Sequence, residues 1–188
     1  MKSGKIILGS LLIVFVALFR LLPHPSNFTP VLAMFLFGAG YFRKNYFMAI
    51  AIPFAAMFIS DFIINNVIYA SYFNSVVWFY QGALWNYIAM ISVALLGIFM
   101  LKNNNIGRII SLSVIASFVF FIISNFGVWA SGVMYPKTIT GLLACYTAAL
   151  PFFTNTLLST IFFSLILFAT TWLFEKRYIL KNEFNNKK

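Results

Sequence analysis

The composition of the 188-residue chain excludes an ordinary soluble domain, because 62% of its residues are hydrophobic and only 9% are charged. Soluble domains carry about 25% charged residues, and they avoid large exposed apolar surfaces. The net charge of +10 is spread over short segments between apolar stretches. It lacks the aromatic and basic clustering of a nucleic-acid-binding module, so we expect no nucleic-acid partner. The single cysteine excludes an intramolecular disulfide and a multi-cysteine zinc site.

Six apolar stretches predict membrane-spanning helices, at residues 5–22, 28–42, 46–69, 83–101, 109–130 and 154–174. A span needs about 20 residues to cross about 30 Å of hydrocarbon. The second stretch is shorter, so the loop before it must lie partly inside the bundle, covered by protein or lining a cavity. Residues 142–153 are apolar but too few to cross, which predicts a short interfacial or re-entrant helix before the last span. The fold class is therefore all-α integral membrane, with one six-transmembrane-helix bundle over residues 1–175 and a basic tail over 176–188.

The basic residues predict the orientation of this bundle. With the N-terminus inside, eleven lysines and arginines fall on the cytoplasmic side, and the outer side holds Arg20 and Lys137. Such a bias is typical of cytoplasmic segments, and six spans return the C-terminus to the same side. We therefore expect a multi-pass protein of the inner (cytoplasmic) membrane, N-in and C-in, with the lipid bilayer as its surroundings. The first stretch lacks a small-residue cleavage site after Arg20, so we expect it to be retained rather than removed as a signal peptide.

Polar residues within the predicted spans gather near the outer ends. At about 1.5 Å per residue, Asp61 lies about 22 Å and Asn125 about 24 Å above the inner ends of their helices. A charge at the bilayer centre costs about 3 kcal/mol or more, so such groups face inward and find partners. This distribution predicts a cavity that is open to the outside and closed toward the cytoplasm.

The candidate substrate-binding residues are Arg20, His24, Asn27, Asp61, Asn125, Trp129, Tyr135 and Lys137. Arg20 and Lys137 would contact anionic groups, and Asp61 a cationic or hydroxyl group. Asn125 would form hydrogen bonds and Trp129 would stack.

Each of these residues also has a purely structural interpretation. Asp61 can pair with Arg20 to join two spans, and Asn125 can hydrogen-bond between helices. Trp129 and Tyr135 suit an aromatic belt at the membrane interface, and His24 suits a plain loop histidine.

The sequence contains no catalytic constellation. One histidine, one cysteine and one intramembrane aspartate do not make a metal cluster or a carboxyl pair. Nothing positions Cys145 and His24 as nucleophile and base. A glycine-rich phosphate loop is absent as well. We therefore expect no enzymatic activity, no metal site and no cofactor.

Several short motifs run through most of the chain: RLLPHP at 20–25, NFTP at 27–30, SD at 60–61, SNFGVW at 124–129, MYPKT at 134–138 and LPFF at 150–153. With these motifs, residues 20–168 resemble a bacterial family of uncharacterised membrane proteins classed as transport proteins. The size and six-span layout are similar to the substrate-binding S components of energy-coupling-factor vitamin transporters. This resemblance implies a vitamin-like solute in an outward-facing pocket, and a separate coupling and ATPase module as a partner.

The first helix departs from the S-component pattern. S components carry small residues spaced four apart on this helix to dock the coupling subunit, whereas residues 6–14 here read IILGSLLIV, without Ala-x-x-x-Ala. The expected function is uptake of a small vitamin-like solute, either with a coupling module or alone. The alternatives are a non-transporting membrane subunit of a larger complex and a proton-coupled solitary carrier that uses Asp61.

Overall fold

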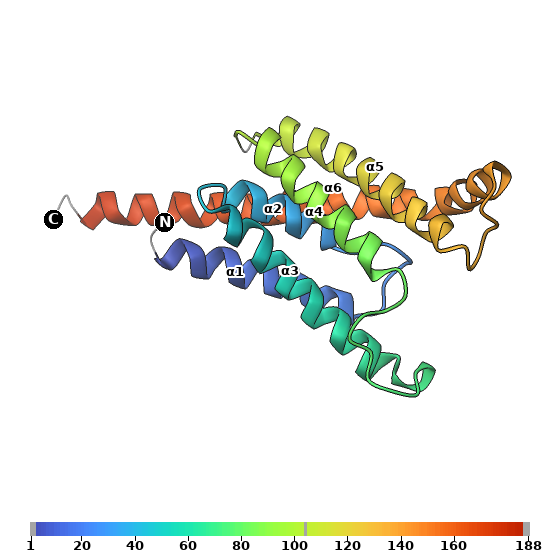
Figure 1. The fold of residues 1–188 in the computed structure, drawn as a ribbon. Coiled ribbons are helices and arrows are strands. Elements are labelled where there is room, and N and C mark those ends of the chain that lie inside the picture. The colour runs from blue at the N-terminus through green and yellow to red at the C-terminus, as the bar shows by residue number, and fades with distance from the viewer. Residues whose placement is uncertain (1–2, 104, 186–188) are drawn as a thin grey trace.

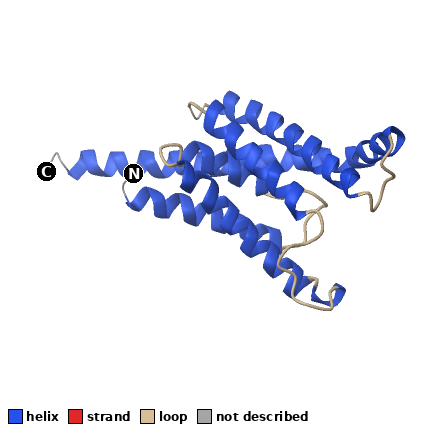
Figure 2. Ribbon diagram, viewed as in Figure 1, coloured by secondary structure: helices blue, strands red, loops and turns tan. Residues whose placement is uncertain are grey.

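The computed structural model describes residues 3–103 and 105–185, and no strand occurs in these ranges (Figure 2). The described residues form six α-helices, which pack into one bundle (Figure 1). They are α1 (Ser3–Leu18), α2 (Val31–Tyr41), α3 (Tyr46–Ile63), α4 (Ala83–Met100), α5 (Ile106–Ser131) and α6 (Ile139–Asn185). Short turns extend two of them: the 3-10 turn η1 (Phe19–Leu21) follows α1, and the π-helical turn η2 (Ile64–Ile68) continues α3. A further 3-10 turn, η3 (Ala70–Tyr72), lies beyond η2.

The predicted all-α membrane bundle is confirmed. Among the described residues, five helices are long and apolar enough to cross a membrane, namely α1, α3, α4, α5 and α6. The sixth, α2, is shorter, with 11 residues. At about 1.5 Å per residue it extends only about 16 Å. It therefore occupies the bundle without crossing the full hydrocarbon thickness.

Helix α2 is the centre of the bundle. Residues Val31 to Gly40 are all buried, and α2 packs on α1, α3, α4, α5 and α6. A helix that is apolar on every face is buried either in a protein core or in lipid, and α2 is buried among other helices. The loop before α2, which the sequence places partly within the bundle, lies against α6 through a 2.9 Å hydrogen bond from Asn155 Nδ2 to the Ser26 carbonyl.

Glycines allow the neighbouring helices to approach α2 closely. A Cβ atom on Gly38 would lie 2.7 Å from the Ala49 carbonyl oxygen and 2.6 Å from Pro53 of α3. A Cβ atom on Gly97 of α4 would lie 2.7 Å from Ala39. Small residues at such contacts are typical of membrane helix packing, where close van der Waals contact replaces the hydrophobic effect.

The last helix differs from the prediction. Residues 142–153 do not form a separate short helix, because α6 runs without a break from Ile139 to Asn185, 47 residues in all. Pro151 lies inside α6, and a proline in a helix interior removes one hydrogen bond and kinks the axis without always ending the helix. Figure 1 shows the first turns of α6 inclined to the remainder. The predicted tail, from residue 176, continues α6 to Asn185, and residues 186–188 lie outside the described ranges.

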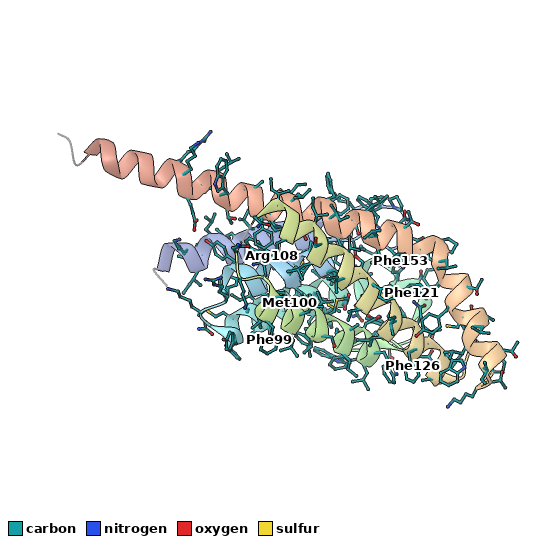
Figure 3. All side chains as sticks on the ribbon, turned by 90° about the horizontal axis from the view of Figure 1, so that it is seen from above. Phe99, Met100, Arg108, Phe121, Phe126 and Phe153 are labelled. Atoms are coloured by element: carbon teal, nitrogen blue, oxygen red, sulfur yellow. The ribbon has the colours of Figure 1, made fainter. Side chains whose placement is uncertain are left out.

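The basic residues mark one end of the bundle, which we call the basic end. Lys5 of α1 pairs with Glu175 of α6 at 2.6 Å. Arg43 donates a hydrogen bond to the Lys102 carbonyl, and Arg108 Nη1 donates to Asn103 at 3.0 Å. Figure 3 shows Arg108 at this end, and Phe121, Phe126 and Phe153 toward the other. The start of α1 and the later part of α6 therefore meet at one end, and its cytoplasmic location stays a prediction.

Candidate functional site

A buried ion pair joins the first and third helical segments. Arg20 Nη2 donates to Asp61 Oδ1 at 2.5 Å, and the two side chains are 14% and 6% exposed. Arg20 Nη1 also donates to Ser60 Oγ at 2.5 Å and to the Met57 carbonyl at 3.3 Å. The ion pair considered for these residues is thus present. It neutralises both charges where an unpaired charge would be costly.

The ion pair retains unused hydrogen-bonding capacity. Asp61 Oδ2 and Arg20 Nε are buried and make no hydrogen bond with any described residue. The Tyr87 hydroxyl on α4 also makes no hydrogen bond of ordinary geometry, but it lies close enough to Asp61 for the two side chains to interact. Buried polar groups are normally paired. Tyr87 is therefore the described group best placed to complete the hydrogen bonding of Asp61.

Tyr80 and Asn86 extend the polar cluster toward a cavity. Asn86 Nδ2 donates to the Tyr80 hydroxyl oxygen at 2.9 Å. Tyr80 lies in the loop before α4, where burial and then the negative charge of Asp61 raise the pKa of its phenol above 10.0, against the lowering effect of the Asn86 hydrogen bond. The phenol therefore keeps its proton at neutral pH.

The cavity beside Asn86 has a volume of about 270 Å³ and lies between the loop before α2, the start of α4, and helices α5 and α6. Four amide side chains line it, Asn27, Gln81, Asn86 and Asn125, and we call it the amide cavity. Ser124 and Thr156 add hydroxyls. The aromatic walls come from Trp85, Phe120, Phe121, Phe152 and Phe153, and no charged residue is among the lining residues described. Phe121 of α5 and Phe153 of α6, both labelled in Figure 3, pack edge to face here, with ring centroids 5.1 Å apart.

Local chain geometry holds the amide cavity in shape. Asn27 adopts a left-handed conformation with φ of 61°, which asparagine tolerates better than most residues. Gly127 of α5 packs directly against Trp85. A Cβ atom at this position would lie only 2.2 Å from the indole ring, so a larger residue would not fit. Asn125 Nδ2 donates to the Phe121 carbonyl at 2.8 Å. Its Oδ1 makes no hydrogen bond within the described residues, so it can accept one from a ligand.

The other predicted site residues lie elsewhere. Trp129 Nε1 donates to the carbonyls of Pro136 and Thr138 at 3.1 and 3.2 Å, which fastens the loop between α5 and α6. Tyr135 and Lys137 belong to this loop, and Lys137 is exposed. His24 stacks on Phe19 with ring centroids 6.0 Å apart, and its Nδ1 lies 3.0 Å from the Pro25 carbonyl oxygen. None of these residues lines the amide cavity.

A second cavity, of about 990 Å³, opens at the basic end. We call it the basic-end cavity; α1, α2, α5 and α6 contribute to its lining. The charged residues among this lining are Lys5, Arg43, Lys44 and Glu175. The two cavities share no described lining residue, so the predicted closure of the outer cavity toward the cytoplasm stays a prediction.

Residues 2–183 match a protein family of unknown function, DUF6580. The chain belongs to the DUF6580 family. No curated protein and no solved structure matches the chain. As a DUF6580 protein with five long apolar helices, it is a multi-pass membrane protein by helix length and hydropathy. These comparisons provide no link to energy-coupling-factor S components.

The sequence did not indicate three contributors to the site of this DUF6580 protein. Gln81 and Asn86 line the amide cavity, but they flank Gly82 at a helix start, where polar residues are common. Asn66 fixes the loop above them, since its side chain donates to the Val77 carbonyl at 2.8 Å and accepts from the Val77 amide at 2.7 Å.

Proposed function

We propose that this protein is a membrane transport protein that captures a small, uncharged, polar solute with a planar group from the outer side. The observation that supports the proposal is the lining of the amide cavity. Amide side chains both donate and accept hydrogen bonds, and aromatic walls favour a flat ligand. The combination suits a neutral heterocycle or amide, in keeping with the vitamin-like solutes that the S-component resemblance implies.

The volume of the cavity limits the size of this solute. Ligand pockets commonly measure about 300–1,000 Å³, so a cavity of about 270 Å³ lies just below that range. It suits a single-ring or small bicyclic molecule. A large cofactor-like vitamin would need the loop before α2 or the loop before α4 to move.

The arrangement of the two cavities supports transport over a static binding role. Asn27, which precedes α2, lines the amide cavity, whereas Gly40 and Tyr41, at the end of α2, line the basic-end cavity. The cavities therefore lie toward opposite ends of one buried helix about 16 Å long. In this proposal, α2 separates the outer and inner openings.

The charged residues take a different role from the one first considered. Arg20 is neutralised by Asp61, and Lys137 lies outside the amide cavity. Neither residue is therefore placed to select an anionic solute. The same ion pair makes Asp61 a poor free proton carrier, because protonation would leave Arg20 buried without a counter-charge.

We propose that the protein works without a coupling module. On α1, Ile7, Leu11 and Phe15 are exposed by 58%, 60% and 73%. These residues are spaced four apart on one face of the helix. Bulky side chains on that face would hinder the close helix contact that small residues permit. The chemistry is binding and translocation rather than catalysis.

Solute binding to the purified protein in detergent tests the proposal. Neutral heterocycles and amides are screened by thermal stabilisation, and the affinity of any hit is measured by calorimetry. Asn125→Ala and Gln81→Ala should each weaken binding about tenfold, the effect of one lost hydrogen bond to a buried ligand. Asn103→Ala, at the basic end, is the matched control and should leave the affinity unchanged. Binding that is insensitive to both cavity variants would refute the site.

A further inference from the structure

We propose that the basic-end cavity is a binding site for an anionic phospholipid, independent of the solute site. The cavity offers about 990 Å³. That space exceeds the needs of a single phosphate group and admits a headgroup with the first part of its acyl chains. The cavity combines cationic side chains with an apolar wall, which a merely basic surface does not.

Three cations and one anion line the cavity, which leaves a net charge of two positive. Glu175 would repel a phosphate, but it is paired with Lys5 at 2.6 Å, and both side chains are about half exposed. Arg43 and Lys44 follow directly after α2, and Arg43 is oriented by its hydrogen bond to the Lys102 carbonyl. A guanidinium beside an ammonium group is a common arrangement for phosphate binding. Basic pockets between membrane helices bind anionic lipid headgroups in the same way.

The opposite wall of the cavity is apolar and comes from α6. Leu165, Phe168, Ala169 and Trp172 line it. Ala169 and Trp172 are also exposed on the outer surface of α6, Trp172 by 60%. The wall is therefore continuous with the surface that lipid acyl chains would contact. A soluble anion would gain nothing from this wall, whereas an amphiphile would bury its chains there.

Trp172 also marks the depth of the site. The Lys176 ammonium lies 5.1 Å from the centroid of the Trp172 ring. Tryptophan and lysine in this order are typical of the level where headgroups meet hydrocarbon. The phosphate of a lipid at that level would lie beside Arg43 and Lys44, with its chains along α6.

Native mass spectrometry of the full chain in a neutral detergent tests the proposal, with phosphatidylglycerol as the probe and phosphatidylcholine as the neutral comparison. We expect one phosphatidylglycerol to be retained at energies that release phosphatidylcholine. The double variant Arg43→Gln/Lys44→Gln should lose this retention by about tenfold or more, because charge-assisted hydrogen bonds to the phosphate are removed. The control Lys102→Gln/Arg177→Gln removes two charges from the same end, outside the cavity lining, and should retain the lipid.

The outcomes separate the sources of the anion. Equal loss in both double variants would overturn the proposal in favour of general electrostatic attraction, and so would no preference for phosphatidylglycerol. Displacement of the lipid by inorganic phosphate alone would also overturn it, because the site would then be one for a soluble anion. Trp172→Ala, which removes apolar wall without charge, should weaken retention of long-chain lipid more than that of a short-chain analogue. Circular dichroism confirms that each variant is folded.

Discussion

At the scale of single residues, Arg20 and Asp61 form a buried ion pair within the bundle. The guanidinium bridges Asp61, Ser60 and the Met57 carbonyl. It fixes the end of the first helical segment against α3. The contact therefore neutralises both charges and holds the two helical segments together. Removal of one partner of a buried ion pair is strongly destabilising, whereas replacement of both partners by apolar residues is often neutral.

Removal of one partner of this pair should be strongly destabilising. Asp61→Asn or Arg20→Met leaves a buried group uncompensated, and each should lower the free energy of unfolding by about 3–5 kcal/mol. The double variant Arg20→Met/Asp61→Leu removes both charges and should recover most of that loss. Unfolding in mixed micelles by increasing fractions of denaturing detergent measures all three. If the double variant loses as much as the two single variants together, packing rather than charge dominates the site.

Individual residues also show where sequence reasoning succeeds. A lone aspartate and a lone arginine at the same predicted depth have few alternatives to each other, so their pairing could be foreseen. Asn125 was likewise indicated by its depth in an apolar helix. Gln81 and Asn86 could not be distinguished from ordinary interfacial polar residues, because their role depends on where the loop before α4 folds. Trp129 was indicated as a ligand contact, but its hydrogen bonds are used by its own loop.

At the scale of elements, close packing around α2 depends on glycines that face rigid neighbours. Gly38 lies against the Ala49 backbone and the Pro53 ring, neither of which can rotate away. Gly4, on α1, has nothing within 4 Å of its Cβ position. The two glycines therefore have opposite surroundings.

Gly38→Ala should destabilise the protein by about 1–3 kcal/mol, because overpacking forces α2 and α3 apart. Gly4 lies in the open first turn of α1, and Gly4→Ala should change the stability by less than about 0.5 kcal/mol. Thermal unfolding in detergent, followed by circular dichroism, compares the two. A stabilising Gly38→Ala would show that the α2–α3 contact is looser than described.

The helices were largely predictable. Long apolar runs, bounded by basic or asparagine-rich segments, predicted α1, α3, α4, α5 and the main part of α6. The sixth, α2, was expected to begin near Phe28 and begins at Val31, after Pro30. Residues 142–153 were misjudged because length alone was used to separate them from the last span. Pro151 bends α6 there but does not end it, and whether a proline kinks or breaks a helix depends on the neighbours that cover it.

At the scale of the whole molecule, the bundle is polarised between two different openings. One end carries a neutral cavity with amides and aromatic rings, and the other a larger cavity with cationic residues. The orientation of this polarity decides which cavity faces the outside. The distribution of lysine and arginine predicts that the amide cavity does.

Cysteine accessibility tests this orientation. In a Cys145→Ala background, Lys137→Cys should react with a membrane-impermeant maleimide on intact cells. Lys102→Cys, at the basic end, should react only after the membrane is permeabilised. Both positions are exposed in the structure, so failure to label reflects the membrane rather than burial. The reverse pattern would place the basic end outside, and both proposed sites would exchange sides.

The burial of α2 also has a consequence for how the protein is made. A segment of 11 residues is too short to serve as a stable stop in a translocation channel, where a span of about 20 residues is the norm. Because its partners α4, α5 and α6 are synthesised later, α2 can pack only against α1 and α3 until they are inserted. Ribosome-bound chains that end before α4 should therefore leave α2 accessible to proteases, and its protection should be acquired last.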